Sequence, residues 1–302
     1  MTTVAEELSS AVADVAARTA PSVVGVGAGG SGVVVGPGLV VTNAHNIRRD
    51  EVVVTFADGR RADGRPAGVD VDGDLAVVSV DTGDAPPLSV SGATVRMGDA
   101  VLALANPGGR AVRVSVGFVS ALDVAFRGPG GRRVPGAIEH TAPLARGSSG
   151  GPVVDVRGNL VGIDTHRVGD GFYLALPADE ELRVRVDALS RGDVPRRPRL
   201  GIAVAPPRVA RRLRQSVGLA ERDGLLVHAV EEGGPADRAG LRPGDLVVRV
   251  AGTDITTVDE LAGALEAADP EASVEVLVVR GADEVTLAVD LAGRGTAHEG
   301  SA

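Results

Sequence analysis

The sequence contains no cysteine, lysine or tryptophan, so no disulfide framework can hold the fold together. Aromatic residues make up only 2% of the chain, which leaves valine, leucine, isoleucine and alanine to fill the core. No run of about 18 apolar residues occurs, which excludes a membrane-spanning helix. All 31 basic residues are arginine, and the 40 acidic residues outnumber them, for a formal net charge of -9. This acidic balance argues against binding to nucleic acid or to an anionic membrane.

The N-terminal segment differs from a secretory signal peptide. It lacks a basic leader, and Glu6, Glu7 and Asp14 interrupt any apolar region. We therefore expect a cytoplasmic chain as it stands, or a periplasmic one if a leader has been removed. The segment instead predicts a helix that Pro21 ends, because its apolar residues recur at helical spacing: Val4, Leu8, Val12 and Val15.

Short valine-rich runs alternate with turns between Ser22 and Pro177. The segments 36–38 (Gly-Pro-Gly) and 57–59 (Ala-Asp-Gly) are typical of hairpin turns. Strands at this spacing, without helices between them, predict a mainly β fold built as a barrel or sandwich. The runs are SVVGV, GVVVG, LVVTNA, EVVVTF, DLAVVSV, AVLALA, VRVSVGFVSAL, GPVVDV, NLVGID and FYLALP.

The composition changes near Asp179, which indicates a second domain. We predict a first domain over residues 1–190, a linker rich in arginine and proline at 191–198, and an α+β domain over 199–292. A disordered tail is predicted at 293–302, where the residues are small and polar. In the second domain, Thr257 and Glu260 form a capping box that predicts a helix with an apolar stripe: Leu261, Ala264, Leu265 and Ala268.

Three short motifs of the first domain carry residues suited to nucleophilic catalysis. They are VTNAH (41–45), DVDGDLAV (70–77) and GSSGGPVV (147–154). A serine hydroxyl needs an adjacent base, histidine suits that task near neutral pH, and a carboxylate must orient the ring. The order His, Asp, Ser within one β-rich domain is the order of the chymotrypsin triad.

The glycine-lined turn around the serine predicts an oxyanion hole. Charge that develops on a substrate carbonyl is stabilised by preorganised backbone N–H groups, and glycine lets the backbone approach closely. We expect these donors in the turn Gly147-Ser148-Ser149, above all from its first and third residues. Competing candidates remain at each catalytic position: Ser148 as nucleophile, His140 and His166 as base, and Asp72 as orienting carboxylate.

The motifs TNAH, DLAVV and GSSGGPVVD resemble the catalytic boxes of the HtrA (Deg) family of serine peptidases. The segments VADV, APSVV, GSG, GDAVLALANP and GFVS are similar to the family as well, so the resemblance covers nearly the whole chain. It implies a chymotrypsin-like double β-barrel. It also implies His45 as general base, Asp74 as its orienting carboxylate and Ser149 as nucleophile.

The resemblance also places the substrate pocket. One wall would be formed by Leu144, Ala145 and Arg146. The opposite wall would be formed by Ile163, Asp164 and Thr165. Asp164 is the one acidic residue that could favour a basic side chain in this pocket. We expect small or medium aliphatic residues before the scissile bond.

Several positions depart from the family pattern. Asn46 follows His45 where the family usually has an aliphatic residue, and Ser148 stands where it usually has asparagine. The N-terminal segment carries no aromatic residue, although the family's trimer contact often uses one. A homotrimer therefore remains open.

The second domain resembles a PDZ domain, with GLRPGD (240–245) as its most specific segment. PDZ domains bind extended peptides by strand addition to a sheet edge. Peptide C-termini would be held by the N–H groups of Leu200, Gly201 and Ile202. Leu261 and Leu265 would line the groove or pack in the core.

Together these features predict a serine endopeptidase for unfolded or damaged proteins, with a PDZ domain for substrate capture or regulation. A holdase-like chaperone and an esterase are the competing functions. No metal ligand set, nucleotide loop or cofactor motif is visible, so we predict neither metal nor cofactor.

Overall fold

The structure is a computed structural model, and it describes residues 3–90, 92–129, 132–169, 171–195, 198–205, 207–216, 218, 222–269 and 273–292. The chain forms two compact units, residues 1–195 and residues 196–302. Each unit has its own hydrophobic core. The tail predicted at 293–302 lies outside the described residues, as does part of the linker predicted at 191–198.

The first unit begins with helix α1 (Val4–Thr19), as the spacing of its apolar residues predicts. Thr3 and Glu6 form a capping box, in which the Thr3 hydroxyl accepts the Glu6 N–H and the Glu6 carboxylate accepts the Thr3 N–H. The 3-10 turn η1 (Ala20–Ser22), which contains proline, ends the helix. Val15 is buried and anchors α1 in the core.

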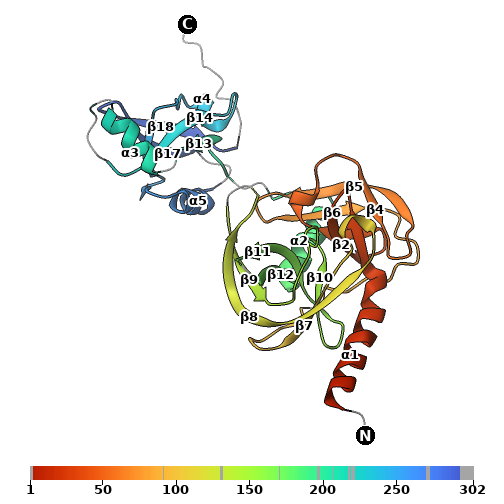
Figure 1. The fold of residues 1–302 in the computed structure, drawn as a ribbon. Helices are drawn as coiled ribbons and strands as arrows, with labels where there is room; N and C mark the ends of the chain where they lie inside the picture. Colours follow the sequence, from red (N-terminus) through yellow and green to blue (C-terminus); the bar gives the residue numbers. More distant parts are fainter. Residues whose placement is uncertain are drawn as a thin grey trace. The chain divides into compact units, whose positions relative to one another are not determined.

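The strands of the first unit close into two six-stranded antiparallel barrels, seen in red to orange and in yellow to green in Figure 1. Their strand orders are β1–β2–β3–β6–β5–β4 and β10–β11–β12–β9–β8–β7. The predicted double β-barrel is therefore confirmed. The strands are β1 (Val23–Val26), β2 (Gly30–Gly36), β3 (Leu39–Thr42), β4 (Val52–Thr55), β5 (Arg61–Asp70), β6 (Leu75–Ser79), β7 (Ala100–Ala105), β8 (Arg113–Arg127), β9 (Arg133–His140), β10 (Pro152–Asp155), β11 (Leu160–Val168) and β12 (Phe172–Pro177).

Two of these strands, β5 and β9, have no counterpart among the predicted runs. Each contains a proline, which cannot donate to a strand ladder and argues against a strand in sequence terms. In β5 the register with β6 shifts between Pro66 and Gly68. A bulge at this point accommodates the proline inside the barrel.

The interior of the first barrel is almost entirely valine, as the low aromatic content predicts. Branched aliphatic side chains suit a pleated surface and pack there without polar atoms. The buried cluster consists of Val24, Val26, Val34, Val40, Val52, Val54, Phe56, Val78 and Val80.

Helix α2 (Glu180–Ser190) follows the second barrel. The Asp179 carboxylate caps it by accepting the Leu182 N–H at 2.9 Å. Leu182, Val186 and Leu189 are buried, so one face of α2 packs in the hydrophobic core of the first unit, to which the helix belongs. Within the described part of the chain, no helix has both the length and the apolar character to cross a bilayer.

The second unit is built on a sheet of order β13–β14–β15–β17–β18, with β16 paired to β15. The predicted capping box of Thr257 and Glu260 is present and starts helix α5. Strand β13 lies at one edge of the sheet. The elements are β13 (Ile202–Val204), α3 (Pro207–Ser216), β14 (Leu225–Val230), α4 (Pro235–Arg238), β15 (Leu246–Val250), β16 (Thr253–Asp254), α5 (Val258–Ala267), β17 (Ser273–Arg280) and β18 (Asp283–Asp290).

Candidate active site

The three residues of the predicted triad lie next to strand ends in the two barrels. His45 is in the 3-10 turn η2 (Ala44–Asn46) after β3, and Asp74 directly precedes β6. Strands β3 and β6 are paired, so their adjoining ends bring the histidine and the aspartate together. Ser149 lies in the loop before β10 of the second barrel. The site therefore draws on both barrels.

His45 and Asp74 are joined directly. The His45 Nδ1 atom lies 2.9 Å from Asp74 Oδ1 and 3.0 Å from Oδ2, and the His45 backbone N–H donates to Oδ1 at 3.2 Å. The aspartate side chain is fully buried, whereas the histidine side chain is 33% exposed. An ionised carboxylate only accepts hydrogen bonds, so it fixes the proton on Nδ1 and leaves Nε2 free to take a serine proton.

Thr165 completes the surroundings of the Asp74 carboxylate. Its hydroxyl donates to Asp74 Oδ2 at 2.5 Å. The buried carboxylate thus receives hydrogen bonds from the His45 ring, from the His45 backbone and from Thr165. These donors offset the cost of removing a carboxylate from water.

Helix α2 holds the turn that carries Asp74. Arg185 Nη2 donates to Asp70 Oδ2 and to the Gly73 carbonyl, both at 3.1 Å, and Asp70 Oδ1 accepts the Gly73 N–H at 2.9 Å. Asp74 has a φ of 49°, in the left-handed region, which costs a residue with a side chain about 1–2 kcal/mol. The contacts of Arg185 offset this strain and hold the turn that positions the Asp74 carboxylate.

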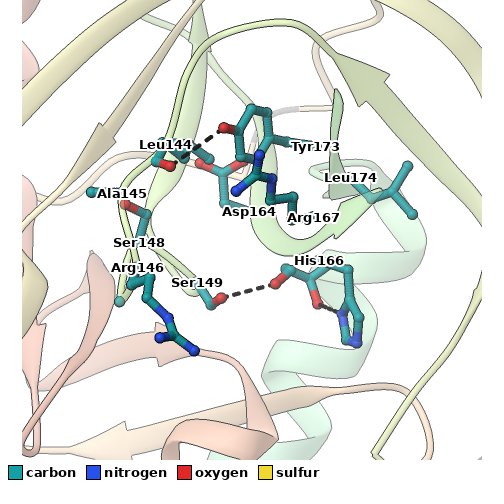
Figure 2. A pocket seen from close by; sticks show the side chains of 12 residues that line it. Leu144, Ala145, Arg146, Ser148, Ser149, Asp164, His166, Arg167, Tyr173 and Leu174 are labelled. Carbon is teal, nitrogen blue, oxygen red and sulfur yellow. Dashed lines mark hydrogen bonds between the residues drawn. The ribbon is translucent and has the colours of Figure 1, made fainter. Parts of the chain in front are cut away.

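The Ser149 hydroxyl donates to the Thr165 carbonyl at 2.8 Å, toward the strand that carries His166 (Figure 2). No hydrogen bond joins Ser149 to His45 among the described residues. Thr165 instead links Ser149 to Asp74, because its carbonyl accepts from Ser149 while its hydroxyl donates to Asp74.

Asn46, one of the departures from the family pattern, binds the Ser149 turn. Its Nδ2 donates to the Ser149 carbonyl at 2.8 Å, and the Ser31 N–H donates to the same oxygen at 3.0 Å. A Cβ atom at Gly30 would lie 2.5 Å from the Asn46 amide carbon, so glycine provides the space for this side chain. Asn46, which directly follows the predicted base His45, therefore binds the backbone of the predicted nucleophile, Ser149.

We expect Asn46→Val to lower kcat for a peptide substrate about tenfold with little change in KM, because a hydrogen bond that positions the nucleophile is lost. Steady-state kinetics measure the effect. Asn46→Asp, which has a similar shape but no donor, is expected to be impaired as well. An unchanged kcat in both variants would show that the Ser31 N–H alone holds the turn.

The loop before Ser149 presents two free backbone donors. Gly147 has a φ of 88°, and a Cβ atom there would lie 2.1 Å from the Gly29 carbonyl oxygen, so this position requires glycine. The Ser148 N–H donates to the Ala145 carbonyl at 3.3 Å and is therefore engaged. The N–H groups of Gly147 and Ser149 have no acceptor in the described part of the chain. This pair is available to bind an oxyanion.

A cavity of about 530 Å³ lies beside the Ser149 turn (Figure 2). Ile163, predicted as a wall residue, does not line it, because this side chain is fully buried in the core. Neighbouring side chains of a strand point to opposite faces, so Ile163 and Asp164 of β11 separate. The predicted pocket residues that do line the cavity are Leu144, Ala145, Arg146, Asp164 and Thr165. The other lining residues are those of the turn Gly147-Ser148-Ser149 and, not predicted for the site's pocket, His166, Arg167, Tyr173 and Leu174.

The two histidines that compete with His45 have other partners. His140 is fully buried, and its Nε2 lies 2.8 Å from Asp164 Oδ1. The His166 Nδ1 atom lies 2.9 Å from the Thr165 hydroxyl, and its ring centroid is 5.9 Å from that of His45. His45 alone of the three has a ring nitrogen within 3.0 Å of the Asp74 carboxylate. In the described residues, no group of three or more acidic or histidine side chains is arranged to hold a metal ion.

Two family profiles match the chain, "Trypsin-like peptidase domain" over residues 30–163 and "PDZ domain" over residues 226–280. The putative serine protease HhoA of Synechocystis sp. is 34% identical over 278 residues, which cover 87% of this chain and 70% of that protein. The chain belongs to the HtrA family of serine proteases. It is a trypsin-like serine endopeptidase with a PDZ domain.

Further relatives and solved structures agree with this family. A probable periplasmic serine endoprotease of Hahella chejuensis, described as DegP-like, is 33% identical over 270 residues, and the match covers 87% of this chain but 56% of that protein. The structure of the HtrA-type protease AlgW with a decapeptide matches with a TM-score of 0.64 at 25% identity, over 92% of this chain and 97% of that one. The serine endoprotease from Yersinia pestis gives 0.62 at 26% identity, over 92% and 96%.

His166 is expected to make this HtrA protease less stable in acid. Burial lowers the pKa of His166, Asp74 partly opposes this, and His45 lowers the pKa further, so it lies below the usual 6.5. As the pH falls below 6.5, the unfolded chain takes up a proton that the folded protein still excludes. The free energy of unfolding therefore decreases as the pH falls, until the pH is below the pKa of the folded protein.

We expect His166→Gln to reduce this acid dependence. Urea unfolding at about pH 7.5 and about pH 5 measures it for both proteins. Tyr173 is the only tyrosine of a chain without tryptophan, so intrinsic fluorescence reports on the peptidase barrels alone. If the free energy of unfolding decreases between these two pH values by the same amount in the variant and the unmodified protein, the role of His166 is contradicted.

The second unit has the elements that PDZ domains use for strand addition. Gly201 has a φ of 76°, and the N–H groups of Leu200 and Gly201 have no acceptor among the described residues. Ile202 begins the edge strand β13. Leu261 and Leu265 of α5 are buried at 8% and 4% exposure and pack in the core of the unit.

Proposed function

We propose that this HtrA protease cleaves unfolded or partly folded proteins through an acyl-enzyme at Ser149. His45 Nε2 takes the hydroxyl proton as Ser149 Oγ attacks the scissile carbonyl, and Asp74 stabilises the imidazolium. The N–H groups of Gly147 and Ser149 bind the oxyanion. His45 then passes the proton to the leaving amine, and an activated water releases the acid product.

The contact between His45 Nδ1 and the buried Asp74 carboxylate, at 2.9 and 3.0 Å, supports this mechanism most strongly. It places an oriented imidazole in the same hydrogen-bond network as Ser149, through Thr165. The two free N–H groups beside Ser149 supply the remaining part of an acyl-transfer site. The match to serine proteases gives the class of reaction, and this network supports His45, Asp74 and Ser149 as the residues that carry it out.

The substrate class is tested with casein, a folded protein and a small ester. Casein is expected to be degraded, and the folded protein is expected to resist cleavage. The small ester is expected to be hydrolysed more slowly than casein is cleaved. Chelators are expected to leave the rate unchanged. An intact casein band beside rapid ester hydrolysis would favour an esterase, and suppressed aggregation without cleavage would favour a holdase.

We propose that the PDZ domain binds the C-terminal carboxylate of extended peptides. The free N–H groups of Leu200 and Gly201 would hold the carboxylate, and β13 would pair with the peptide. A peptide with a free C-terminus should bind more tightly than its amidated form in a fluorescence anisotropy titration. Equal affinity of both peptides would contradict carboxylate recognition.

The homotrimer implied by the resemblance stays a prediction, which the mass in solution tests.

A further inference from the structure

One end of the substrate pocket carries a buried carboxylate with one oxygen unused. Asp164 is 1% exposed and lines the pocket near Tyr173 and Leu144 (Figure 2). Its Oδ1 atom lies 2.8 Å from His140 Nε2. Its Oδ2 atom is buried and has no hydrogen-bond partner among the described residues. A buried acceptor without a partner is unfavourable, so a substrate group that donates to Oδ2 gains free energy on binding.

Oδ2 is an acceptor as long as the Asp164 carboxylate is ionised, because the His140 proton faces Oδ1. The His140 Nδ1 atom accepts the Ala142 N–H at 3.3 Å, which places the ring proton on Nε2 and directs it at Asp164 Oδ1. Burial raises the pKa of Asp164, and the hydrogen bond to His140 opposes this. A proton added to the carboxyl group would be held on Oδ2, because Oδ1 already accepts from His140, so Oδ2 offers only lone pairs in the ionised form.

The other lining residues favour a neutral side chain over a cationic one. Arg146 and Arg167 both line the pocket (Figure 2), and their charges disfavour a lysine or arginine side chain. The Tyr173 hydroxyl donates to the Leu144 carbonyl at 3.4 Å, so it does not satisfy Asp164. The pocket therefore combines apolar side chains with the unused acceptor of Asp164.

We propose that Asp164 selects a residue with a neutral hydrogen-bond donor before the scissile bond, threonine or serine above all. His140 acts as a positioning residue, because it holds the carboxylate through Oδ1 and leaves Oδ2 without a partner among the described residues. This inference rests on the proposed function, since it names the substrate class of the same site. It departs from the aliphatic preference expected from the sequence, for valine has the shape of threonine but no donor.

The test compares kcat/KM of the full chain on three fluorogenic peptides that differ only before the scissile bond, with threonine, valine or arginine there. Threonine is expected to exceed valine and arginine at least about tenfold, because a site built to bind a hydroxyl rejects an analogue without one. Each preparation is also titrated with a fluorophosphonate, which counts reactive serines.

A double variant, His140→Leu with Asp164→Val, removes both polar partners and leaves neither buried alone. Its threonine-to-valine ratio is expected to fall to about one or below. The ratio compares two substrates on one preparation, so a loss of folded protein cancels. If the variant does not fold, the ratio measured on the unmodified protein still decides.

Each failure has its own signature. Fluorophosphonate labelling, together with the highest kcat/KM for the valine or arginine peptide, would overturn the role of Asp164. The proposed peptidase function would be unaffected by this result. A ratio that stays high in the double variant would also overturn it. No labelling and no cleavage of any peptide would overturn the proposed function and the specificity together.

Discussion

Ser149→Ala is expected to lower kcat/KM for a peptide substrate by about 10⁶-fold, the cost of removing the nucleophile from a Ser-His-Asp site. The variant keeps the His45–Asp74 pair and the N–H groups of the loop, so only a residual rate over water remains. Hydrolysis of one fluorogenic peptide, measured for the purified full chain and the variant, gives this ratio.

Ser148→Ala is the matched control for this prediction. Ser148 is adjacent in the chain, is also a serine, and is 4% exposed. Its replacement removes the competing hydroxyl and leaves the one that bonds Thr165. We expect the control to retain acyl-enzyme formation, and a loss confined to Ser148→Ala would assign the nucleophile to that residue instead.

Asp74→Asn is expected to lower kcat by about 10⁴-fold. Both carboxylate oxygens now accept, one from the His45 ring and backbone and the other from the Thr165 hydroxyl. An amide replaces one acceptor with an NH₂ group, which either opposes the Thr165 hydroxyl or forces the His45 proton onto Nε2. In the second case the ring cannot take the serine proton. Single-turnover acylation measures the effect apart from product release.

Asp72→Asn is the control for the orienting carboxylate, since Asp72 is the competing candidate in the same turn. The Asp72 carboxylate lies 3.5 Å from Arg132 Nη1 rather than against His45. We expect only a small change in kcat. A fall comparable to that of Asp74→Asn would mean that the whole turn, and not one carboxylate, controls the imidazole.

The sequence predicts the barrels well where local pattern and tertiary structure agree. The valine-rich runs become strands because their residues both favour extended backbone and bury well. The residues of strand β5 do not favour a strand locally, since Pro66 and the charged residues around it oppose one. It becomes a strand through its pairing with β4 and β6. Contacts of this kind join residues far apart in the chain and leave no periodic signal.

The triad residues are predictable because they stand at strand ends in a known order, but their partners are not. Thr165 and Arg185 set the position of Asp74 from other parts of the first unit, and no local motif indicates either contact. The alternation of β11 could have excluded Ile163 from the pocket, since it shares a strand with Asp164 at the next position. Asn46 was visible as a departure, yet its bond to Ser149 appears only in the fold.

Fluorophosphonate labelling of the full chain, with the adduct located by mass spectrometry, tests the triad most directly. One adduct is predicted, on Ser149, with a rate that collapses in His45→Ala. An adduct on Ser148, or a rate on Ser149 that is unchanged in His45→Ala, would contradict the assignment of His45, Asp74 and Ser149 as the catalytic residues.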